Sequence, residues 1–360
     1  MSVARGIFIC LLNQSLIHSF WVFKGKKEQM QKNSPFYRGK HIVSARDFDR
    51  PTLEKLFQRT GEMKEISQTS GGRERLRSIL YRNGDPVHCI ILHDGPSTRT
   101  ISSFDRATKA LGGNSLVSPL RFSSIEKGES FSDTAAVLGA DYDTIVIRAD
   151  KHPGVARVMA NAVDERGLKT IVINAGDGPE EHPTQMLVDL FTIWRWRPIS
   201  LTRGALTYAL VGDLARSRTI HSLLLGLKLF GGRVFLVGPA NINIPQWLES
   251  EITCEEFPIV KVEDPLTIAP LIDVWYFTRL QTNLEGSPFS EEEKIQFAQT
   301  YGASIDFRKY KKKDAIILHP LPHDREYSPD IDLTDNAFIH FPQAHNGRYI
   351  RMALLEMLLT

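Results

Sequence analysis

The sequence predicts an α/β protein with two doubly wound parallel-sheet domains joined by interdomain helices. Short apolar runs typical of buried strands alternate with segments of helical spacing, and this alternation starts again after Arg197-Pro198. With 360 residues, the chain is long enough for two domains of ordinary size. We therefore place one domain at residues 36–183 and the other at residues 198–345, with the last helix, residues 346–360, packing back on the first domain.

Residues 1–35 stand apart from this pattern. The apolar run Ile7–Leu12 is too short to span a bilayer, and the first acidic residue is Glu28. We interpret this segment as an N-terminal extension that is either disordered or a targeting signal. Three widely separated cysteines favour a reducing compartment. We expect a cytoplasmic protein; the alternative is an organellar one, if residues 1–29 are a targeting peptide.

The composition limits the partners. A hydrophobic content of 42% and a charged content of 24% are typical of a soluble globular protein. The formal net charge of +2 gives no reason to expect nucleic acid or membrane as a partner, so any anion site must be local. The chain has no Cys-x-x-Cys pair, and we expect neither a metal nor a cofactor.

The first half contains four apolar runs that we read as strands: Val87–Leu92, Ser115–Val117, Thr144–Ile147 and Thr170–Ile173. Segments of helical spacing precede, separate or join these runs: Phe48–Arg75, Phe104–Leu111, Asp133–Leu138 and Pro153–Val163. A strand followed by a helix and another strand predicts parallel pairing, with helices on both faces of the sheet.

A glycine-rich loop, Asn174 to Gln185, leads into a long helix, Thr184–Arg195, before the pattern restarts. The second half gives the strands Leu206–Val211, Gly232–Val237, Val260–Val262, Asp273–Phe277 and Ile316–Leu318. It gives the helices Arg218–Leu229 and Pro245–Glu251, and a final helix, Gly347–Leu359, that we expect to be strongly amphipathic.

The stretch after the first strand is the most informative. Gly95-Pro96 breaks the strand, and Ser97, Thr98, Arg99 and Thr100 then place hydroxyls and a guanidinium at a helix start. Because a helix N-terminus offers unpaired N–H groups and partial positive charge, this combination suits a phosphate. The alternative is an ordinary helix cap, since serine and threonine are preferred capping residues.

Other polar residues also follow predicted strands. Ligands of open α/β sheets lie beyond the carboxyl ends of the strands. The residues at such positions, directly or in the loop that follows, are Ser97–Thr100, Arg148, His182, Arg218, Arg279 and Leu321. We therefore expect them to form one site.

A series of motifs in sequence order resembles those of the aspartate/ornithine carbamoyltransferase family, over about residues 37–360. They are Ser97-Thr98-Arg99-Thr100, the loop with Ser123 and Lys127, Arg148 at a strand end, His182-Pro-Thr-Gln185, the segment from Val211 to Ser222, and Thr278-Arg279-Leu280-Gln281 with His319-Pro-Leu-Pro322. The last position has Pro320 where the ornithine branch has cysteine, so the resemblance is to the aspartate branch.

The resemblance implies transfer of a carbamoyl group from carbamoyl phosphate to the amino group of L-aspartate, in pyrimidine biosynthesis. It implies a homotrimer with shared active sites, without deciding whether separate regulatory subunits bind. The two domains become a carbamoyl-phosphate lobe and an aspartate lobe. The catalytic residues implied are Thr100, Lys127, Arg148 and His182. The carbamoyl-phosphate site is implied to contain Ser97, Thr98, Arg99, Thr100, Ser123, Arg148, His182, Gln185, Pro320, Leu321 and Pro322, and the aspartate site Lys127, Arg218, Arg279 and Gln281.

Two positions depart from the aspartate branch, which has a glutamate and an arginine where this chain has Gly95 and Leu284. The resemblance implies that this pair locks the domains together, so we expect Asp94 to reach Arg218 instead. Two alternatives stay open: a carbamoyltransferase for another amino acid or amine, and a non-catalytic homologue. A nucleotide-dependent dehydrogenase is disfavoured, because no Gly-x-Gly-x-x-Gly follows Val211.

Overall fold

The computed structural model describes residues 37–82, 84–95, 97–196, 205–280, 289–303, 307–328 and 340–360. The expected N-terminal extension, Pro96, the break at Arg197-Pro198, Gln281 and Leu284 lie outside these ranges. Within them, no helix combines the length and the apolar character needed to cross a bilayer.

The first lobe contains a four-stranded parallel sheet in the order β4-β3-β5-β6. Its strands are β3 (His88–His93), β4 (Asn114–Pro119), β5 (Thr144–Ala149) and β6 (Ile171–Asp177). Alternate residues along β3 enter two different apolar clusters: Ile90 and Leu92 pack towards α6, while Cys89 and Ile91 join the main core. This alternation shows that both faces of the sheet are covered, as predicted.

The helices of this lobe are α2 (Arg50–Ile66), α3 (Gly72–Arg77), α4 (Thr98–Ala110), α5 (Phe131–Asp141) and α6 (Val155–Glu165). Two predicted boundaries were wrong. The segment Phe48–Arg75 is two helices, because a turn at residues 67–71 separates α2 from α3. Helix α4 begins at Thr98 rather than at Phe104, which places the predicted donor-rich stretch inside its first turn. Short 3-10 turns, η1 (Ala45–Asp47), η2 (Leu120–Phe122) and η3 (Ser124–Lys127), and a hairpin, β1 (Tyr81–Arg82) with β2 (Asp85–Pro86), complete the lobe.

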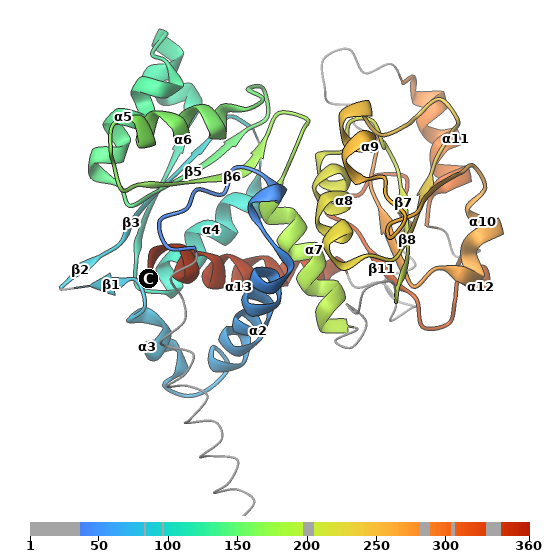
Figure 1. The fold of residues 1–360 in the computed structure, drawn as a ribbon, viewed down its shortest axis with the longest axis horizontal. Coiled ribbons are helices and arrows are strands. Elements are labelled where there is room, and N and C mark those ends of the chain that lie inside the picture. Colours follow the sequence, from blue (N-terminus) through green and yellow to red (C-terminus); the bar gives the residue numbers. More distant parts are fainter. Residues whose placement is uncertain are drawn as a thin grey trace, which may run out of the picture.

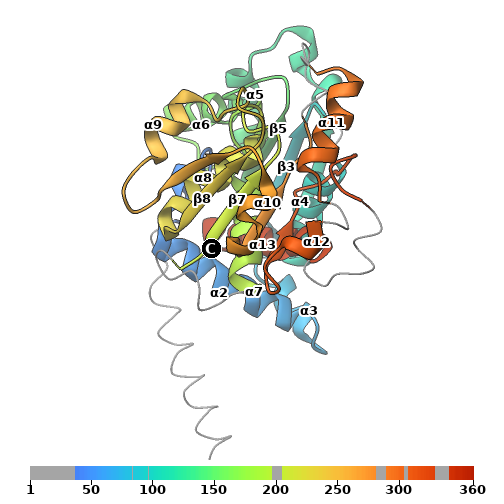
Figure 2. The ribbon, with the colours of Figure 1, turned by 90° about the vertical axis from the view of Figure 1, so that its right-hand side faces the viewer.

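The second lobe contains a five-stranded parallel sheet in the order β11-β10-β7-β8-β9. Its strands are β7 (Thr207–Val211), β8 (Arg233–Val237), β9 (Ile259–Val262), β10 (Val274–Phe277) and β11 (Ile316–Leu318). The helices described with it are α8 (Arg218–Phe230), α9 (Gln246–Ile252), α10 (Pro265–Ile268) with a 3-10 turn, η4 (Ala269–Leu271), α11 (Glu291–Tyr301) and α12 (Phe307–Tyr310). Figure 2 shows this lobe in front of the first.

Two helices connect the lobes: α7 (Pro183–Trp196) and α13 (His340–Leu359) (Figure 1). Helix α7 packs against α8 of the second lobe and against α13, and α13 packs against α2 and α4 of the first. One apolar cluster runs through both lobes and both helices. The prediction that the last helix is strongly amphipathic was wrong: Ile350 to Leu355 are all buried, because α13 is enclosed by α2, α4 and α7.

Candidate active site

The two sheets place their topological switch points opposite each other. In the first sheet, β4 and β5 lie on opposite sides of β3, so the crevice opens beyond the carboxyl ends of β3 and β5. In the second sheet, β8 and β10 lie on opposite sides of β7, and the crevice opens beyond β7 and β10. A cavity of about 1140 Å³ lies between these crevices and is lined by residues of both lobes.

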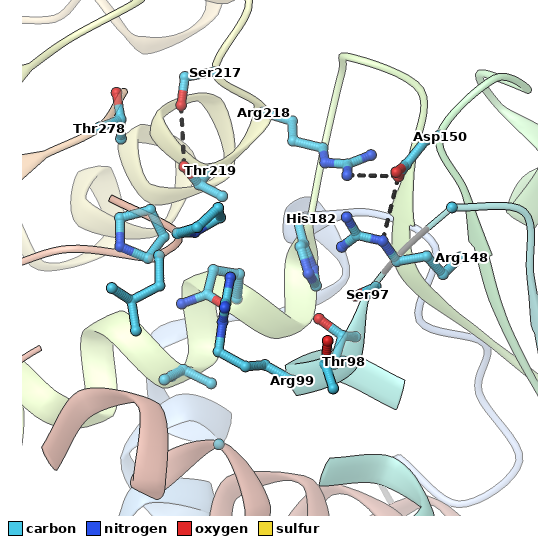
Figure 3. Close-up of a pocket in the computed structure, with 18 of the residues that line it drawn as sticks. Ser97, Thr98, Arg99, Arg148, Asp150, His182, Ser217, Arg218, Thr219 and Thr278 are labelled. Carbon is cyan, nitrogen blue, oxygen red and sulfur yellow. Dashed lines mark hydrogen bonds and ion pairs between the residues drawn. The ribbon is translucent and has the colours of Figure 1, made fainter. Parts of the chain in front are cut away.

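The start of α4 forms one wall of this cavity. Ser97 occupies the N-cap position, yet its side chain makes no capping hydrogen bond, and no acidic residue occupies the first turn. Ser97, Thr98, Arg99 and Thr100 all line the cavity. Figure 3 labels the first three of them. The first turn therefore offers backbone N–H groups, hydroxyls and a guanidinium to an anion, so capping does not explain why Ser97 is there.

Two arginines from opposite lobes meet in the cavity. Arg99 begins α4 and Arg279 follows β10. Burial and the nearby charge of Arg279 lower the pKa of Arg99. Two cations brought together in this way favour an anionic ligand between them.

Arg148, at the end of β5, lies deep in the cavity. Its side chain is 13% exposed, and its Nη1 donates to the carbonyl of Ala175 over 3.4 Å. Burial, and then the charge of Arg218, lower the pKa of Arg148 to about 10, so the guanidinium remains charged at neutral pH. Arg148 is therefore a fixed positive charge beside His182, which Figure 3 shows next to it.

His182 precedes α7 and is almost fully buried. Burial, then the charges of Arg148, Arg218 and Arg351, hold its pKa well below the usual value of 6.5. The imidazole is therefore neutral at physiological pH, and it can donate one hydrogen bond without adding a further charge.

Gln185 lines the cavity with a defined orientation. Its Nε2 donates to Oδ1 of Asp189 over 2.8 Å, which leaves its carbonyl oxygen as the available acceptor. Asp189 also accepts from Gln343 of α13 (2.6 Å) and from the hydroxyl of Tyr276 on β10 (2.8 Å). This buried network joins α7, α13 and the second sheet behind the cavity.

The loop after β11 brings Pro320, Leu321 and Pro322 to the cavity wall. Leu321 has a positive φ of 59°, which is uncommon for a branched residue. Its N–H donates to Nδ1 of His319 over 2.9 Å, and Nε2 of His319 contacts Glu326 over 3.0 Å. These contacts assign the proton of His319 to Nε2 and hold the loop in this conformation.

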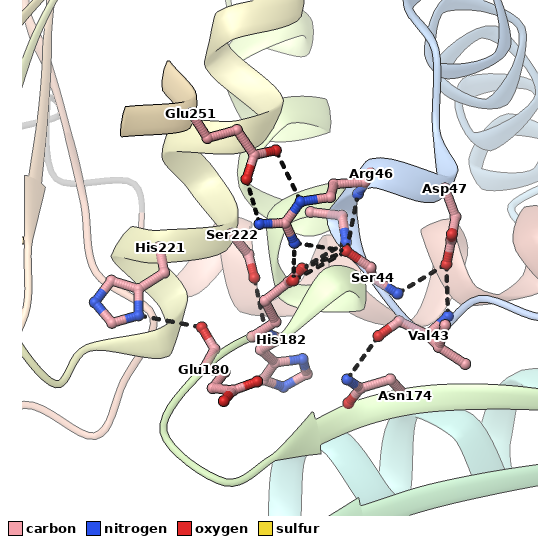
Figure 4. A network of polar contacts seen from close by, with 12 residues as sticks. Val43, Ser44, Arg46, Asp47, Asn174, Glu180, His182, His221, Ser222 and Glu251 are labelled. Carbon is pink, nitrogen blue, oxygen red and sulfur yellow. Dashed lines mark hydrogen bonds and ion pairs between the residues drawn. The ribbon is translucent and has the colours of Figure 1, made fainter. Parts of the chain in front are cut away.

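The loop that carries His182 is anchored to both lobes (Figure 4). Glu181 accepts from Nη1 of Arg46 in the first lobe, and Nε of Arg46 donates to Glu251 of α9 in the second lobe over 2.8 Å. The N–H of His182 itself donates to the hydroxyl of Ser222 on α8 over 2.8 Å. The position of His182 therefore depends on contacts to both lobes.

Most of the site residues expected from the sequence line this one cavity: Ser97, Thr98, Arg99, Thr100, Arg148, His182, Gln185, Arg218, Arg279, Pro320, Leu321 and Pro322. Ser123 and Lys127 do not line it, and Lys127 is exposed on the surface. Gln281 lies outside the described residues. Within the part of the chain that the structure describes, no three His, Cys, Asp or Glu side chains are grouped so that they could hold a metal.

The expectation that Asp94 reaches Arg218 was wrong. Asp94 accepts from the backbone N–H groups of Asp150 (2.7 Å) and Lys151 (3.0 Å), so its carboxylate holds the loop after β5. The carboxylate that contacts Arg218 belongs to Asp150. Its place two residues after Arg148, at the end of the same strand, was a signal that could have identified it.

Sequence reasoning also missed two lining residues of α13, Gln343 and Arg351. They lie within a helix and follow no strand end, so no local pattern marks them. Arg351 is buried, and burial, with the charge of Arg148, lowers its pKa to about 9. Its Nη2 donates to the hydroxyl of Thr184 over 3.3 Å.

Two family descriptions match the chain: "Aspartate/ornithine carbamoyltransferase, carbamoyl-P binding domain" over residues 40–195, and "Aspartate/ornithine carbamoyltransferase, Asp/Orn binding domain" over residues 205–358. The aspartate carbamoyltransferase catalytic subunit of Nitrosopumilus maritimus is 38% identical over 333 residues, which cover 90% of this chain and 98% of that protein. The catalytic subunit of Methanopyrus kandleri is 34% identical over 324 residues, which cover 90% and 98%.

Solved structures show the same similarity. Aspartate transcarbamoylase from Trypanosoma cruzi in complex with N-(phosphonacetyl)-L-aspartic acid matches with a TM-score of 0.78 and 29% identity, covering 90% of this chain and 97% of that chain. The same enzyme in complex with carbamoyl phosphate and aspartate matches with a TM-score of 0.77 and 29% identity, covering 90% and 96%.

Proposed function

The chain belongs to the aspartate/ornithine carbamoyltransferase family, and on that premise we propose that it transfers the carbamoyl group of carbamoyl phosphate to the amino group of L-aspartate. One observation carries the proposal: arginines of both lobes, Arg99 and Arg148 from the first and Arg218 and Arg279 from the second, line one cavity. The substrates carry a phosphate and two carboxylates, and these four cations match that set of anions.

The reaction places two demands on the site. The amine lone pair forms a C–N bond to the carbonyl carbon, the bond from that carbon to the phosphate oxygen breaks, and the departing phosphate accepts the proton that the nitrogen loses. Negative charge develops on the carbonyl oxygen and on the departing phosphate, and both must be stabilised. The site must also hold the amine and the carbonyl carbon in attack geometry, and reactants held in this way need no covalent intermediate.

The first lobe supplies the carbamoyl-phosphate half of the site. We assign the phosphate to the start of α4, to Ser97, Thr98, Arg99 and Thr100, because N–H groups and a guanidinium converge there. We assign the carbonyl oxygen to Thr100, Arg148 and His182, since a charged guanidinium lies beside a neutral imidazole. The free carbonyl oxygen of Gln185 and the backbone carbonyls of Pro320 and Leu321, with Pro322, can accept from the carbamoyl NH2 group.

The second lobe supplies the aspartate half. Arg218 is the first residue of α8, and Arg279 follows β10. Both line the cavity opposite α4, where each can bind one carboxylate of the amino acid. Gln281, two residues after Arg279, is assigned to the same group from the sequence motif.

The site is completed by a neighbouring subunit in a homotrimer. Ser123 and Lys127 belong to a loop that does not reach the cavity of its own chain. Beside this loop, β4 is an edge strand with Leu116 exposed by 50%, and Phe122 is exposed by 76%. An apolar edge next to a lysine with no local role supports self-association through this surface.

The activity is tested by a colorimetric ureido-product assay with carbamoyl phosphate and either L-aspartate or L-ornithine. The proposal expects L-aspartate to be the better acceptor, which accords with a place in pyrimidine biosynthesis. A better acceptor in a wider amino-acid panel would replace aspartate as the substrate. Absence of product with every acceptor would favour a non-catalytic homologue.

Shared sites are tested by mixing two inactive variants, Arg99→Ala and Lys127→Ala, after dissociation and reassociation. If each site needs both residues from different subunits, hybrid trimers contain some intact sites, and activity returns. If activity does not return although hybrids form, Lys127 does not serve a neighbouring site.

A further inference from the structure

One carboxylate lies among the cations of the cavity. Six arginine side chains and two aspartates line it within the described residues. Asp94 is occupied by backbone N–H groups. Asp150 is therefore the acidic side chain that faces the arginines, and the chemistry proposed above gives it no role.

Asp150 contacts one arginine from each lobe through the same oxygen (Figure 3). Nη2 of Arg218 donates to Oδ1 of Asp150 over 2.7 Å, and Nε of Arg148 lies 3.2 Å from that oxygen. Arg148 is the penultimate residue of β5 in the first lobe, and Arg218 begins α8 in the second. The carboxylate thus joins the two lobes at the floor of the substrate cavity.

The surroundings keep this carboxylate charged and in place. Burial by itself raises the pKa of Asp150, but Arg148 and Arg218 outweigh it and hold the pKa below its ordinary value. The side chains of both arginines are less than one fifth exposed, so their mutual repulsion is poorly screened. The carboxylate between the two guanidiniums offsets this repulsion.

Gly95 leaves the space that this carboxylate occupies. A Cβ at position 95 would lie 2.5 Å from Oδ2 of Asp150 and 3.2 Å from its Cγ. These separations are shorter than van der Waals contact, so alanine at position 95 would displace the carboxylate of Asp150 from its present position. The carboxylate of Asp150 can therefore take this position because residue 95 is a glycine.

We propose that Asp150 is a positioning residue that aligns Arg148 with the carbamoyl oxygen and Arg218 with the acceptor carboxylate, and that Gly95 is required to accommodate it. The inference rests on the proposed function for its kinetic consequences. Arg218 is also held by the carbonyl of Gly178, to which its Nη1 donates over 2.7 Å. Loss of Asp150 therefore leaves Arg218 with one of its two anchors.

The first test compares Asp150→Asn with the native protein, because asparagine keeps the shape and removes the charge. We expect the KM for L-aspartate to rise at least about tenfold, and kcat to fall, as for loss of one partner of a buried charge pair. The KM for carbamoyl phosphate should change less, since the start of α4 is untouched. Asp141→Asn, an exposed aspartate of the same lobe, is the matched control and should leave all constants unchanged.

The second test uses the contact between Asp150 and Gly95. Gly95→Ala should lower activity by itself, whereas in an Asp150→Ala background the same change should cost little more, because the collision is gone. A Gly95→Glu and Asp150→Ala pair, which relocates the carboxylate, should recover part of the affinity for aspartate that Asp150→Ala loses. Additive effects of the two alanine changes would overturn the inference.

A crystal structure of Asp150→Asn separates this inference from the proposed function. If the native protein forms no ureido product from aspartate, the proposed function fails, but the structure still decides the role of Asp150. Displaced guanidiniums of Arg148 and Arg218 support the role. Guanidiniums in their native positions, or native kinetics of Asp150→Asn, refute it.

Discussion

Replacing Asp189 by asparagine should make the stability of the protein less sensitive to pH. Asp189 is fully buried and accepts from Gln185 and Gln343 through one oxygen and from Tyr276 through the other. An asparagine can keep its oxygen towards the two glutamines and donate its amide to the oxygen of Tyr276. The variant thus removes a charge and leaves each partner of Asp189 with a hydrogen bond.

The expected magnitude follows from the pKa. Burial raises the pKa of Asp189 from 3.8 to about 7, although its three donors oppose this rise. The folded state binds this proton more tightly than the unfolded state does. The contribution of Asp189 to the free energy of unfolding is therefore complete below pH 4 and is lost as the pH rises through 7. The loss is about 4 kcal/mol in all, of which about 3 kcal/mol falls between pH 5 and pH 8.

The assay is denaturant unfolding of the native protein and of Asp189→Asn at a series of pH values from 5 to 8. The variant should gain stability relative to the native protein as the pH rises, and aspartate carbamoylation should persist because Gln185 keeps its orientation. Asp141→Asn, which changes an exposed carboxylate, should run parallel to the native protein. A difference between Asp189→Asn and the native protein that stays constant over this range would refute the reasoning.

Three further measurements concern the site and the contacts that hold it. Gly212 has a φ of 139°, and a Cβ there would lie 2.1 Å from Oγ1 of Thr278. Gly212→Ala should therefore separate the ends of β7 and β10, and steady-state kinetics should show kcat/KM reduced at least about tenfold. Because the pKa of His182 lies well below 6.5, its ring proton resonances should not titrate between pH 6.5 and pH 8 in an NMR experiment, and a titration there would contradict a neutral imidazole. Arg46→Gln removes the ion pairs of Arg46 with Glu181 and, across the lobes, with Glu251. It should lower the free energy of unfolding by about 1 kcal/mol at low salt, and by less in 1 M salt, in denaturant unfolding.

The cationic cavity needs its anionic partner for a physical reason. The arginines that line the cavity carry like charges and repel one another. Asp150 offsets this repulsion between Arg148 and Arg218, at a point that leaves the start of α4 open to an anion. One side chain thus links an arginine of each lobe in the cavity wall.

The local sequence pattern was sufficient to predict the strands of this protein and several residues of its cavity. Each strand predicted from the sequence is present. The inner strands were the clearest, because a strand covered on both faces must be apolar along its length, as Val274–Phe277 is. The residues that follow strand ends, such as Arg148 and Arg279, were identified because parallel strands bring their carboxyl ends to one edge. The donor-rich turn at Ser97 needed only the chemistry of a helix start.

Only the tertiary structure decided which carboxylate meets which arginine, and which side chains of α13 reach the cavity. Asp150 and Arg218 are 68 positions apart, and Asp189 and Gln343 are 154 apart. No local periodicity encodes such pairs, because they depend on how the two lobes and the helices α7 and α13 pack together. Helix α13 was misjudged as amphipathic for the same reason: its exposure is set by α2, α4 and α7, which enclose it.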